Sequence, residues 1–265
     1  MKVKVLILGL LVLLAFGCGK DDDEVVAVPT CKTTQYVNNG NIYELVYDGQ
    51  DRLVQVNTRY FMNPQMQPYI AISYNAAGRI SEVKSFKGDG VSVAATEVFD
   101  YNANGLLNKI TLTYAGQSPY TRKTFEYNAA GQLVKESDHN LTEVFLYTTF
   151  TYLPGNKVKE ERYCSPGNGT NSYSLCTVME WTFGTVKNPM SGFGYINESL
   201  SFTALRSAFL PESYKVARAI TNGVPSGEDV TVLNYTFNPE GYPLTQTSVT
   251  SGKESGAAAY SYNCQ

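Results

Sequence analysis

Very few residues of this chain belong to the types that usually do covalent or acid–base chemistry. It has one histidine, His139, and five cysteines. A serine or cysteine nucleophile normally needs a histidine base, and zinc sites are built from several histidines or thiolates. We therefore expect no catalytic triad, no metal site and no cofactor. His139 stands in the polar stretch "SDHN", which indicates a surface hairpin turn.

Carboxylates are the remaining side chains with catalytic potential, and the chain has 24 of them. A glycoside hydrolase needs two carboxyl groups that face each other across a cleft, about 5–10 Å apart. Five carboxylates of the repeated units described below are expected instead to be polar partners of turns and strand faces: Asp48, Glu82, Asp100, Glu126 and Glu160. We therefore expect no enzyme, and a carboxylate-pair glycoside hydrolase stays as an alternative.

The cysteine nearest the N-terminus, Cys18, ends a segment with the layout of an export signal. Lys2 and Lys4 precede an apolar run, Val5 to Phe16, that is too short to span a bilayer as a helix. The run leads into "AFGC", which resembles the bacterial lipobox, where the cysteine is lipidated and becomes the first residue of the mature chain. We expect residues 1–17 to be removed and Cys18 to carry lipid. The alternative is a signal peptide without lipidation.

Residues 18–30 are expected to form an acidic tether. The stretch "GKDDDE" follows Cys18, and like charges in a block repel each other and stay disordered. The same stretch resembles the acidic export signal of surface lipoproteins in the Bacteroidetes. We expect an outer-membrane lipoprotein that is exposed at the cell surface and touches the membrane only through its lipid. A periplasm-facing position is the alternative.

The net charge of −3 comes without a basic stripe, so the chain is not expected to bind nucleic acid. We expect a monomer. Four cysteines remain beyond Cys18, an even number in an oxidising compartment, and three pairings are possible. Our hypothesis joins Cys164 to Cys176, closing a Gly/Ser/Asn-rich loop, and Cys31 to Cys264, joining the two ends of the mature domain.

A repeated phrase organises most of the chain, as in "ISYNAAGRISEV" and "FEYNAAGQLVKE". Its aromatic residue recurs at intervals of 25–27 residues in five units, and a sixth unit and a partial seventh follow after a longer interval. The aromatic residues of units 1 to 7 are Tyr47, Tyr74, Tyr101, Tyr127, Tyr152, Phe237 and Tyr262. A regular period of this length indicates a repeat architecture.

The four residues after the aromatic predict a type I turn followed by a left-handed residue that forms a bulge. The clearest first and fourth positions of this turn are Asn75 and Gly78, Asn102 and Gly105, Asn128 and Gly131, and Asn238 and Gly241. In such a hairpin the aromatic faces the residue six positions on, which is apolar in units 1–5. The residue eight positions on is polar, so the apolar stripe is expected only near the turn.

The consensus resembles the YD repeat of RHS proteins, most closely in "YDGQDRL" of unit 1 and in Tyr74 with Gly78-Arg79-Ile80 of unit 2. As a whole, the chain resembles Bacteroidetes lipoproteins grouped as a domain of unknown function (4595 type). The resemblance implies a curved antiparallel sheet and no known active site. In RHS proteins the repeats build a shell, and the activity lies elsewhere.

We therefore expect an all-β fold: an antiparallel meander of about a dozen strands that forms a curved or partly closed sheet. It occupies residues 31–265 as one domain, with an insertion around 184–212 and a short helix near 199–209. The helix is expected to cover part of the sheet, and a lid or ligand loop is the alternative. Because insertions in repeat arrays often carry binding, Trp181 and Tyr195 are the first candidate binding residues.

These expectations lead to a non-catalytic cell-envelope lipoprotein that binds a glycan, a peptide or a protein. An envelope structural or assembly protein without a small ligand is the first alternative, ahead of the hydrolase.

Overall fold

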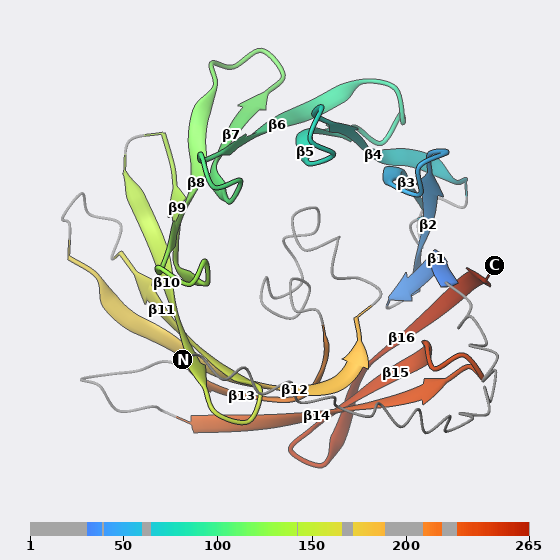
Figure 1. Cartoon of the computed structure of the whole chain (residues 1–265), viewed down its shortest axis with the longest axis vertical. Helices are drawn as coiled ribbons and strands as arrows, with labels where there is room; N and C mark the ends of the chain where they lie inside the picture. Colours follow the sequence, from blue (N-terminus) through green and yellow to red (C-terminus); the bar gives the residue numbers. More distant parts are fainter. Residues whose placement is uncertain are drawn as a thin grey trace, which may run out of the picture.

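The computed structural model describes residues 31–38, 40–59, 65–141, 143–165, 172–188, 209–218 and 227–264. These residues form sixteen strands in one closed antiparallel barrel, in which each strand pairs with its sequence neighbours and β1 pairs with β16 (Figure 1). The strands are β1 (Cys31–Asn38), β2 (Asn41–Tyr47), β3 (Leu53–Arg59), β4 (Gln67–Tyr74), β5 (Ile80–Phe86), β6 (Val93–Tyr101), β7 (Leu107–Tyr114), β8 (Tyr120–Tyr127), β9 (Leu133–His139), β10 (Val144–Leu153), β11 (Lys157–Cys164), β12 (Ser174–Lys187), β13 (Phe209–Arg218), β14 (Gly227–Phe237), β15 (Pro243–Thr250) and β16 (Lys253–Cys264).

The all-β antiparallel meander is confirmed, but the sheet closes completely and has more strands than expected. The extra strands come from the region between units 5 and 6, where β12 and β13 continue the barrel without the repeated turn. The described parts of the expected insertion at 184–212 belong to these two strands. The helix expected at 199–209 lies outside the described residues except for Phe209, which is the first residue of β13.

Residues 1–30, which include the expected signal, Cys18 and the tether, also lie outside the described residues. Within the described ranges, no helix has the length and apolar character needed to cross a membrane.

The repeated turn has the predicted geometry, which unit 2 illustrates. The Asn75 carbonyl accepts the Gly78 N–H at 2.9 Å, and the Asn75 N–H donates to the Arg79 carbonyl at 2.8 Å. The Asn75 side-chain Oδ1 accepts the N–H groups of Ala77 and Arg79, each at 3.0 Å. Gly78 has a φ of 72°, a conformation that is costly for a β-branched residue. Positive φ recurs at the fourth turn position of the other units: Asp51, Gly105, Gly131, Asn156 and Gly241.

The strand facing beyond the turn differs from the expectation. The aromatic does pair with the residue six positions on, as Tyr74 does with Ile80. The ladder then shifts by one residue in units 1–4, so that the residue nine positions on lies across from the apolar residue that precedes the aromatic by two. The pairs are Leu45–Val56, Ile72–Val83, Phe99–Ile110 and Phe125–Glu136. The apolar stripe of units 1–3 therefore runs on past the turn.

Buried side chains share one face of the strands, and we assign this face to the inside of the barrel because nothing packs on the outside of a single closed sheet. The largest core cluster lies on β1 to β8 and β16, and it consists of Tyr36, Leu45, Leu53, Val56, Ile70, Ile72, Val83, Phe99, Leu107, Ile110, Phe125 and Tyr260.

The opposite, outer face is rich in charged residues that form ion pairs with each other. Among the described residues, the cross-strand pairs are Lys109–Asp100, Lys135–Glu126, Lys157–Glu180 and Lys215–Glu228, and the pairs along one strand are Lys84–Glu82 and Lys159–Glu161, at distances between 2.7 and 3.2 Å. The barrel is thus apolar on much of its inner wall and charged outside.

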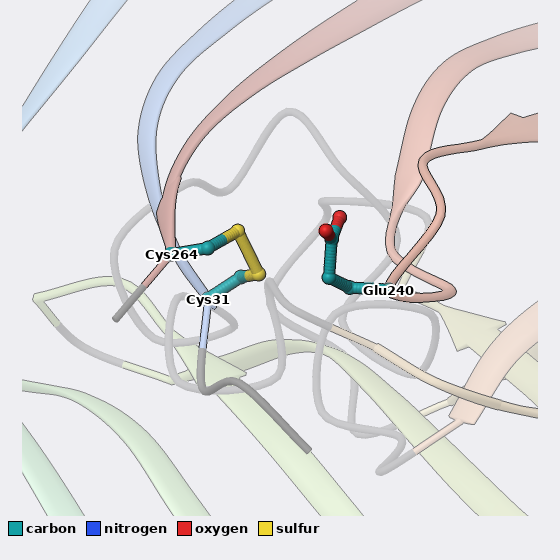
Figure 2. A group of neighbouring side chains, drawn as sticks. All are labelled: Cys31, Glu240 and Cys264. Atoms are coloured by element: carbon teal, nitrogen blue, oxygen red, sulfur yellow. A yellow bond between two sulfur atoms is a disulfide. The ribbon is translucent and has the colours of Figure 1, made fainter. Parts of the chain in front are cut away.

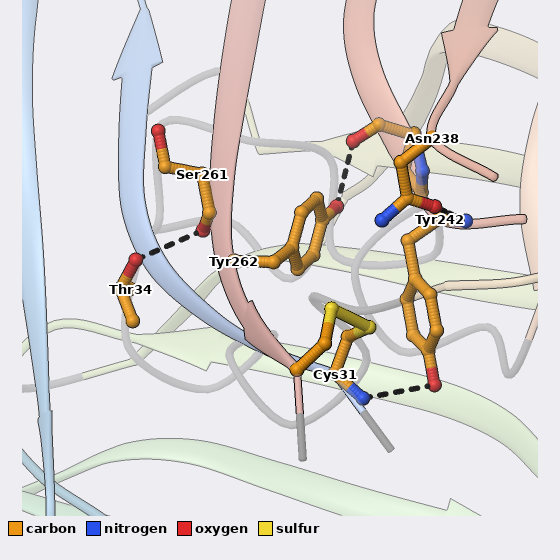
Figure 3. Close-up of a disulfide and its surroundings, with 8 residues drawn as sticks. Cys31, Thr34, Asn238, Tyr242, Ser261 and Tyr262 are labelled. Atoms are coloured by element: carbon orange, nitrogen blue, oxygen red, sulfur yellow. Dashed lines mark hydrogen bonds between the residues drawn. A yellow bond between two sulfur atoms is a disulfide. The ribbon is translucent and has the colours of Figure 1, made fainter. Parts of the chain in front are cut away.

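The two ends of the barrel differ. The Asn-x-x-Gly turns lie together at one end, called here the turn end, and the connections β3–β4, β5–β6, β9–β10 and β11–β12 lie at the other, the loop end. β1 begins at the turn end, where a disulfide joins Cys31 to Cys264 (Figure 3). Beside it, the Tyr262 hydroxyl donates to the Pro243 carbonyl at 2.7 Å, and the Cys31 N–H points at the Tyr242 hydroxyl at 3.4 Å.

A second disulfide joins Cys164 at the end of β11 to Cys176 in β12. Both bridges match the pairing hypothesised from the sequence. The first closes the barrel between its first and last strands, and the second holds the β11–β12 connection at the loop end.

Candidate functional site on the inner wall

The residues chosen from the sequence do not form an open binding surface. Trp181 lies in β12 with only 3% of its surface exposed, and its ring packs against Tyr214 at 4.7 Å and Phe183 at 6.4 Å between centroids. Tyr195 lies outside the described residues. His139 is the last residue of β9 rather than part of a turn, and its Nε2 lies 3.0 Å from the Thr124 hydroxyl. Burial lowers the pKa of His139, so this imidazole is neutral at neutral pH.

Two buried glutamates interrupt the inner wall. Glu136 on β9 and Glu160 on β11 occupy the positions across from Phe125 and Phe150, where units 1–3 carry an aliphatic side chain. Glu136 is 4% exposed and Glu160 is 5% exposed. The expectation that Glu160 is a polar partner on a strand face is therefore wrong. Unit 5 lacks the ladder shift at its turn, and this difference turns the residue eight positions on from its aromatic inward.

Glu136 and Asp138 share one ion-pair partner, the ammonium group of Lys123. Lys123 on β8 forms ion pairs with Glu136 and with Asp138, which lies directly across from it. One carboxylate oxygen of Glu136 is thereby satisfied. The other, Oε2, is buried and has no hydrogen-bond partner among the described residues.

Glu160 is the more strongly perturbed group. Its pKa is raised to about 7, mainly by burial and to a smaller extent by the charge of Glu136, while Arg162 and Trp181 oppose the shift. Its Oε1 is buried without a hydrogen-bond partner in the described ranges. Trp181, on the next strand, is close enough to favour the charged form, yet its indole Nε1 makes no hydrogen bond of ordinary geometry with a described residue. Glu160 is thus partly protonated near neutral pH.

Among the described residues, this leaves two buried acceptors and one buried donor unsatisfied: Glu136 on β9, and Glu160 and Trp181 on the paired strands β11 and β12. We call Lys123, Glu136, Asp138, Glu160 and Trp181 the inner-wall cluster. An unsatisfied buried polar atom costs about 1–3 kcal/mol, so three of them together are unusual in a wall that is otherwise apolar. A ligand that both donates and accepts hydrogen bonds would satisfy them.

The inner face is more exposed on either side of the inner-wall cluster. On β11, Glu160 is buried but Arg162, two residues nearer that end on the same face, is exposed. On β9, Glu136 is buried, whereas the side chain of Asp138 is 20% exposed. Exposure of the inner face therefore increases toward the loop end, and it also increases toward the turn end, where Tyr152 is 44% exposed.

A second group with metal-ligand atoms, Cys31, Glu240 and Cys264, lies at the turn end (Figure 2). Its two sulfur atoms form the disulfide, so no thiolate is present to bind a cation. Glu240 belongs to the turn of unit 6 and faces the bridge (Figure 2).

No simple sequence signal pointed to Glu136, Lys123 and Asp138. Alternation counted from the aromatic places the residue eight positions on inside and its neighbour outside. The ladder shift reverses this assignment in units 1–4, and only an allowance for a second bulge, beyond the one in the turn, would have placed Glu136 on the inner face.

The described strands thus form a closed sixteen-stranded antiparallel barrel, and the interior of this barrel is apolar and partly acidic. It is similar to a porin-like protein from Bacteroides uniformis, with a TM-score of 0.53 and 12% identity over 87% of this chain and 96% of that one. A porin-like protein from Bacteroides vulgatus matches with a TM-score of 0.41 and 12% identity, over 88% of this chain and 99% of the other.

The crystal structure of TcdB2-TccC3 also matches, with a TM-score of 0.23 and 12% identity over 82% of this chain and 14% of that one. At these identities the similarity concerns the fold, and of these three structures the Bacteroides uniformis protein is the one similar enough to support it. No family model and no curated protein matches the chain.

Proposed function

We propose that this protein is a non-catalytic cell-envelope lipoprotein that binds a glycan on the inner wall of its barrel. The observation that carries the proposal is the gathering of three unpartnered buried polar atoms, Glu136 Oε2, Glu160 Oε1 and Trp181 Nε1. A functional site tolerates such atoms when a ligand pairs with them.

Hydroxyl groups are the chemistry that fits all three atoms. A sugar hydroxyl donates to a carboxylate and accepts from an indole N–H at the same time. A metal ion or an ammonium group would pair with the carboxylates but leave the indole donor unsatisfied.

The charged outer face supports a barrel whose outer surface is in contact with water and not with lipid. A barrel that spans a membrane carries an apolar band outside and polar groups inside, and a charged residue facing lipid costs about 2–4 kcal/mol at the midplane. This barrel has the reverse pattern, with six ion pairs on its outer face. Attachment through a lipid at Cys18 is consistent with such a wall.

The position of the N-terminal strand limits the distance between the barrel and the proposed lipid anchor. β1 begins with Cys31 at the turn end, and the 13 residues from Cys18 to Cys31 reach at most about 45 Å. A lipid at Cys18 would therefore keep the turn end within about 45 Å of the membrane surface.

One observation favours a second candidate function. Two buried carboxyl groups that influence each other, one of them with a pKa near 7, resemble the acid and base of a glycoside hydrolase. The hydrolase candidate predicts release of reducing ends from a bound glycan, and this release should disappear in Glu160→Gln.

A glycan array probed with the domain 25–265 tests the proposal, and the hits are then incubated with the protein and analysed for cleavage. Binding without cleavage supports the proposal. Cleavage supports the hydrolase, and a lack of binding to any glycan supports a structural envelope protein.

A further inference from the structure

A cavity of about 140 Å³ lies at the loop end, formed by β3, β4, β5 and the connection that follows β5. Its lining residues are Thr58, Gln65, Gln67, Pro68, Tyr69, Phe86, Lys87 and Gly88. It is separate from the inner-wall cluster, which belongs to β8, β9, β11 and β12. We call it the Thr58 cavity.

Thr58 gives this cavity an unsatisfied polar atom. Its side chain is on the inner face of β3, in the row of Leu53 and Val56, and it is 4% exposed. The hydroxyl Oγ1 has no hydrogen-bond partner among the described residues. A hydroxyl buried in this way is normally bonded to protein, to water or to a ligand.

The polar part of the lining is uncharged, apart from one cation, Lys87. Gln65 and Gln67 contribute side-chain amides, which both donate and accept hydrogen bonds. Lys87 is exposed, and Asp89 stands two residues away in the same connection. Hydrogen bonds from Ser92 and Val91 lower the pKa of Asp89 to about 2, so its negative charge balances Lys87. This balance favours an uncharged ligand.

The apolar part of the lining consists of rings. Pro68, Tyr69 and Phe86 face the same space as the amides. A cavity of about 150 Å³ accepts a single six-membered ring such as benzene. A ring that fits here must also carry a hydrogen-bonding group, because the buried Thr58 hydroxyl would otherwise remain without a partner among the described residues.

We propose that the Thr58 cavity binds one uncharged pyranose ring and is a sugar subsite distinct from the inner-wall cluster. The proposal rests on the proposed function for its biological meaning, since the ring would be one unit of the bound glycan. Its physical basis is independent of that function, because no residue of the cluster lines the cavity.

Free monosaccharides test the inference directly. The domain 25–265 is titrated with D-glucose, D-galactose, D-mannose and, as an apolar ring of similar size, phenol, with binding followed by isothermal calorimetry or ligand-observed NMR. We expect at least one hexose to bind, and Thr58→Val to weaken it by about tenfold through loss of one hydrogen bond. The matched control is Thr113→Val, on the outer face of β7, which should bind the hexose as the wild type does.

The variant Glu160→Val separates this inference from the proposed function. It should leave binding of the free hexose unchanged while it weakens binding of the larger glycan at least tenfold. Equal hexose binding by wild type and Thr58→Val would overturn the subsite and leave the proposed function standing. Binding of phenol but of no hexose would also overturn it, and hexose binding without any glycan hit would overturn the proposed function alone.

Discussion

Glu160 on β11 lies directly across from Phe150 on β10, inside the barrel, where units 1–3 have Val56, Val83 and Ile110. The same fold therefore accepts an aliphatic residue at this position, and units 4 and 5 carry a buried carboxylate instead. The carboxylate lowers stability wherever it must be charged, because its desolvation is not repaid by a full set of hydrogen bonds.

The first prediction concerns pH. The pKa of Glu160 is raised to about 7 in the folded protein and returns to 4.5 when the chain unfolds. The folded state therefore holds its proton more tightly, and the free energy of unfolding should fall by about 3 kcal/mol as pH rises from 4.5 to 7 and then level off. Urea unfolding at several pH values measures this, and Glu160→Gln should lose most of the dependence. An unchanged slope in the variant would show that Glu160 is not the titrating group.

The second prediction concerns the repeated turn. Gly131 has a φ of 76°, and only Leu106 approaches a Cβ built there, at 3.9 Å. Gly131→Val should lower the free energy of unfolding by about 1–3 kcal/mol through backbone strain alone. Gly49 lies in the turn of unit 1 without positive φ and with open space around it, so Gly49→Val is the matched control. Equal stability of the two variants, measured by urea unfolding, would contradict the turn assignment.

The third prediction concerns the contact between neighbouring units. The Tyr74 hydroxyl donates to the Leu53 carbonyl at 2.7 Å, and Tyr101 does the same to Ile80 at 2.8 Å. The tyrosines of units 2 and 3 thus each hold the preceding unit. Removing the hydroxyl in Tyr74→Phe should cost about 1 kcal/mol, because the bond is lost while the ring packing remains. Tyr163 is the control, because its ring stacks on Tyr147 and its hydroxyl has no hydrogen-bond partner among the described residues. A Tyr163→Phe loss as large as that of Tyr74→Phe would refute the role of this bond.

The fourth prediction compares the two disulfides. The Cys31–Cys264 bridge spans 233 residues and the Cys164–Cys176 bridge spans 12. In the chain-entropy account, loss of the first should cost about 5 kcal/mol and loss of the second about 3 kcal/mol. Thermal unfolding of the paired Cys→Ser variants tests the order. A larger effect from the short bridge would mean that the ends of the barrel are held mainly by strand pairing between β1 and β16.

Local turn chemistry was predictable from the sequence because it depends on a few adjacent residues. An Asn at the first position and a residue that tolerates positive φ at the fourth were enough to place the hairpins and the pairing of Tyr74 with Ile80. The disulfide between Cys31 and Cys264 followed from cysteine count and position. These signals do not depend on what the rest of the chain does.

Closure of the barrel, and the identity of the residues that face its interior, were not predictable in the same way. β12 and β13 pair through long-range hydrogen bonds and carry no repeated turn, so the region between units 5 and 6 resembled an insertion. The inward side of Glu136 depends on a one-residue ladder shift, and in a strand a shift by one residue exchanges the two faces. The candidate site was missed because its residues lie just past that shift.

Calorimetric titration of a glycan identified on the array into Glu160→Val tests the central claim most directly. The variant places in unit 5 the type of residue that units 1–3 already carry, so it should fold and be at least as stable as the wild type at pH 8. Its outer-face neighbour Glu161, which pairs with Lys159 at 2.7 Å, provides the control Glu161→Gln. The account predicts that Glu160→Val binds the glycan at least tenfold more weakly and that Glu161→Gln binds it normally. Unchanged affinity in a stable Glu160→Val protein would contradict an inner-wall glycan site.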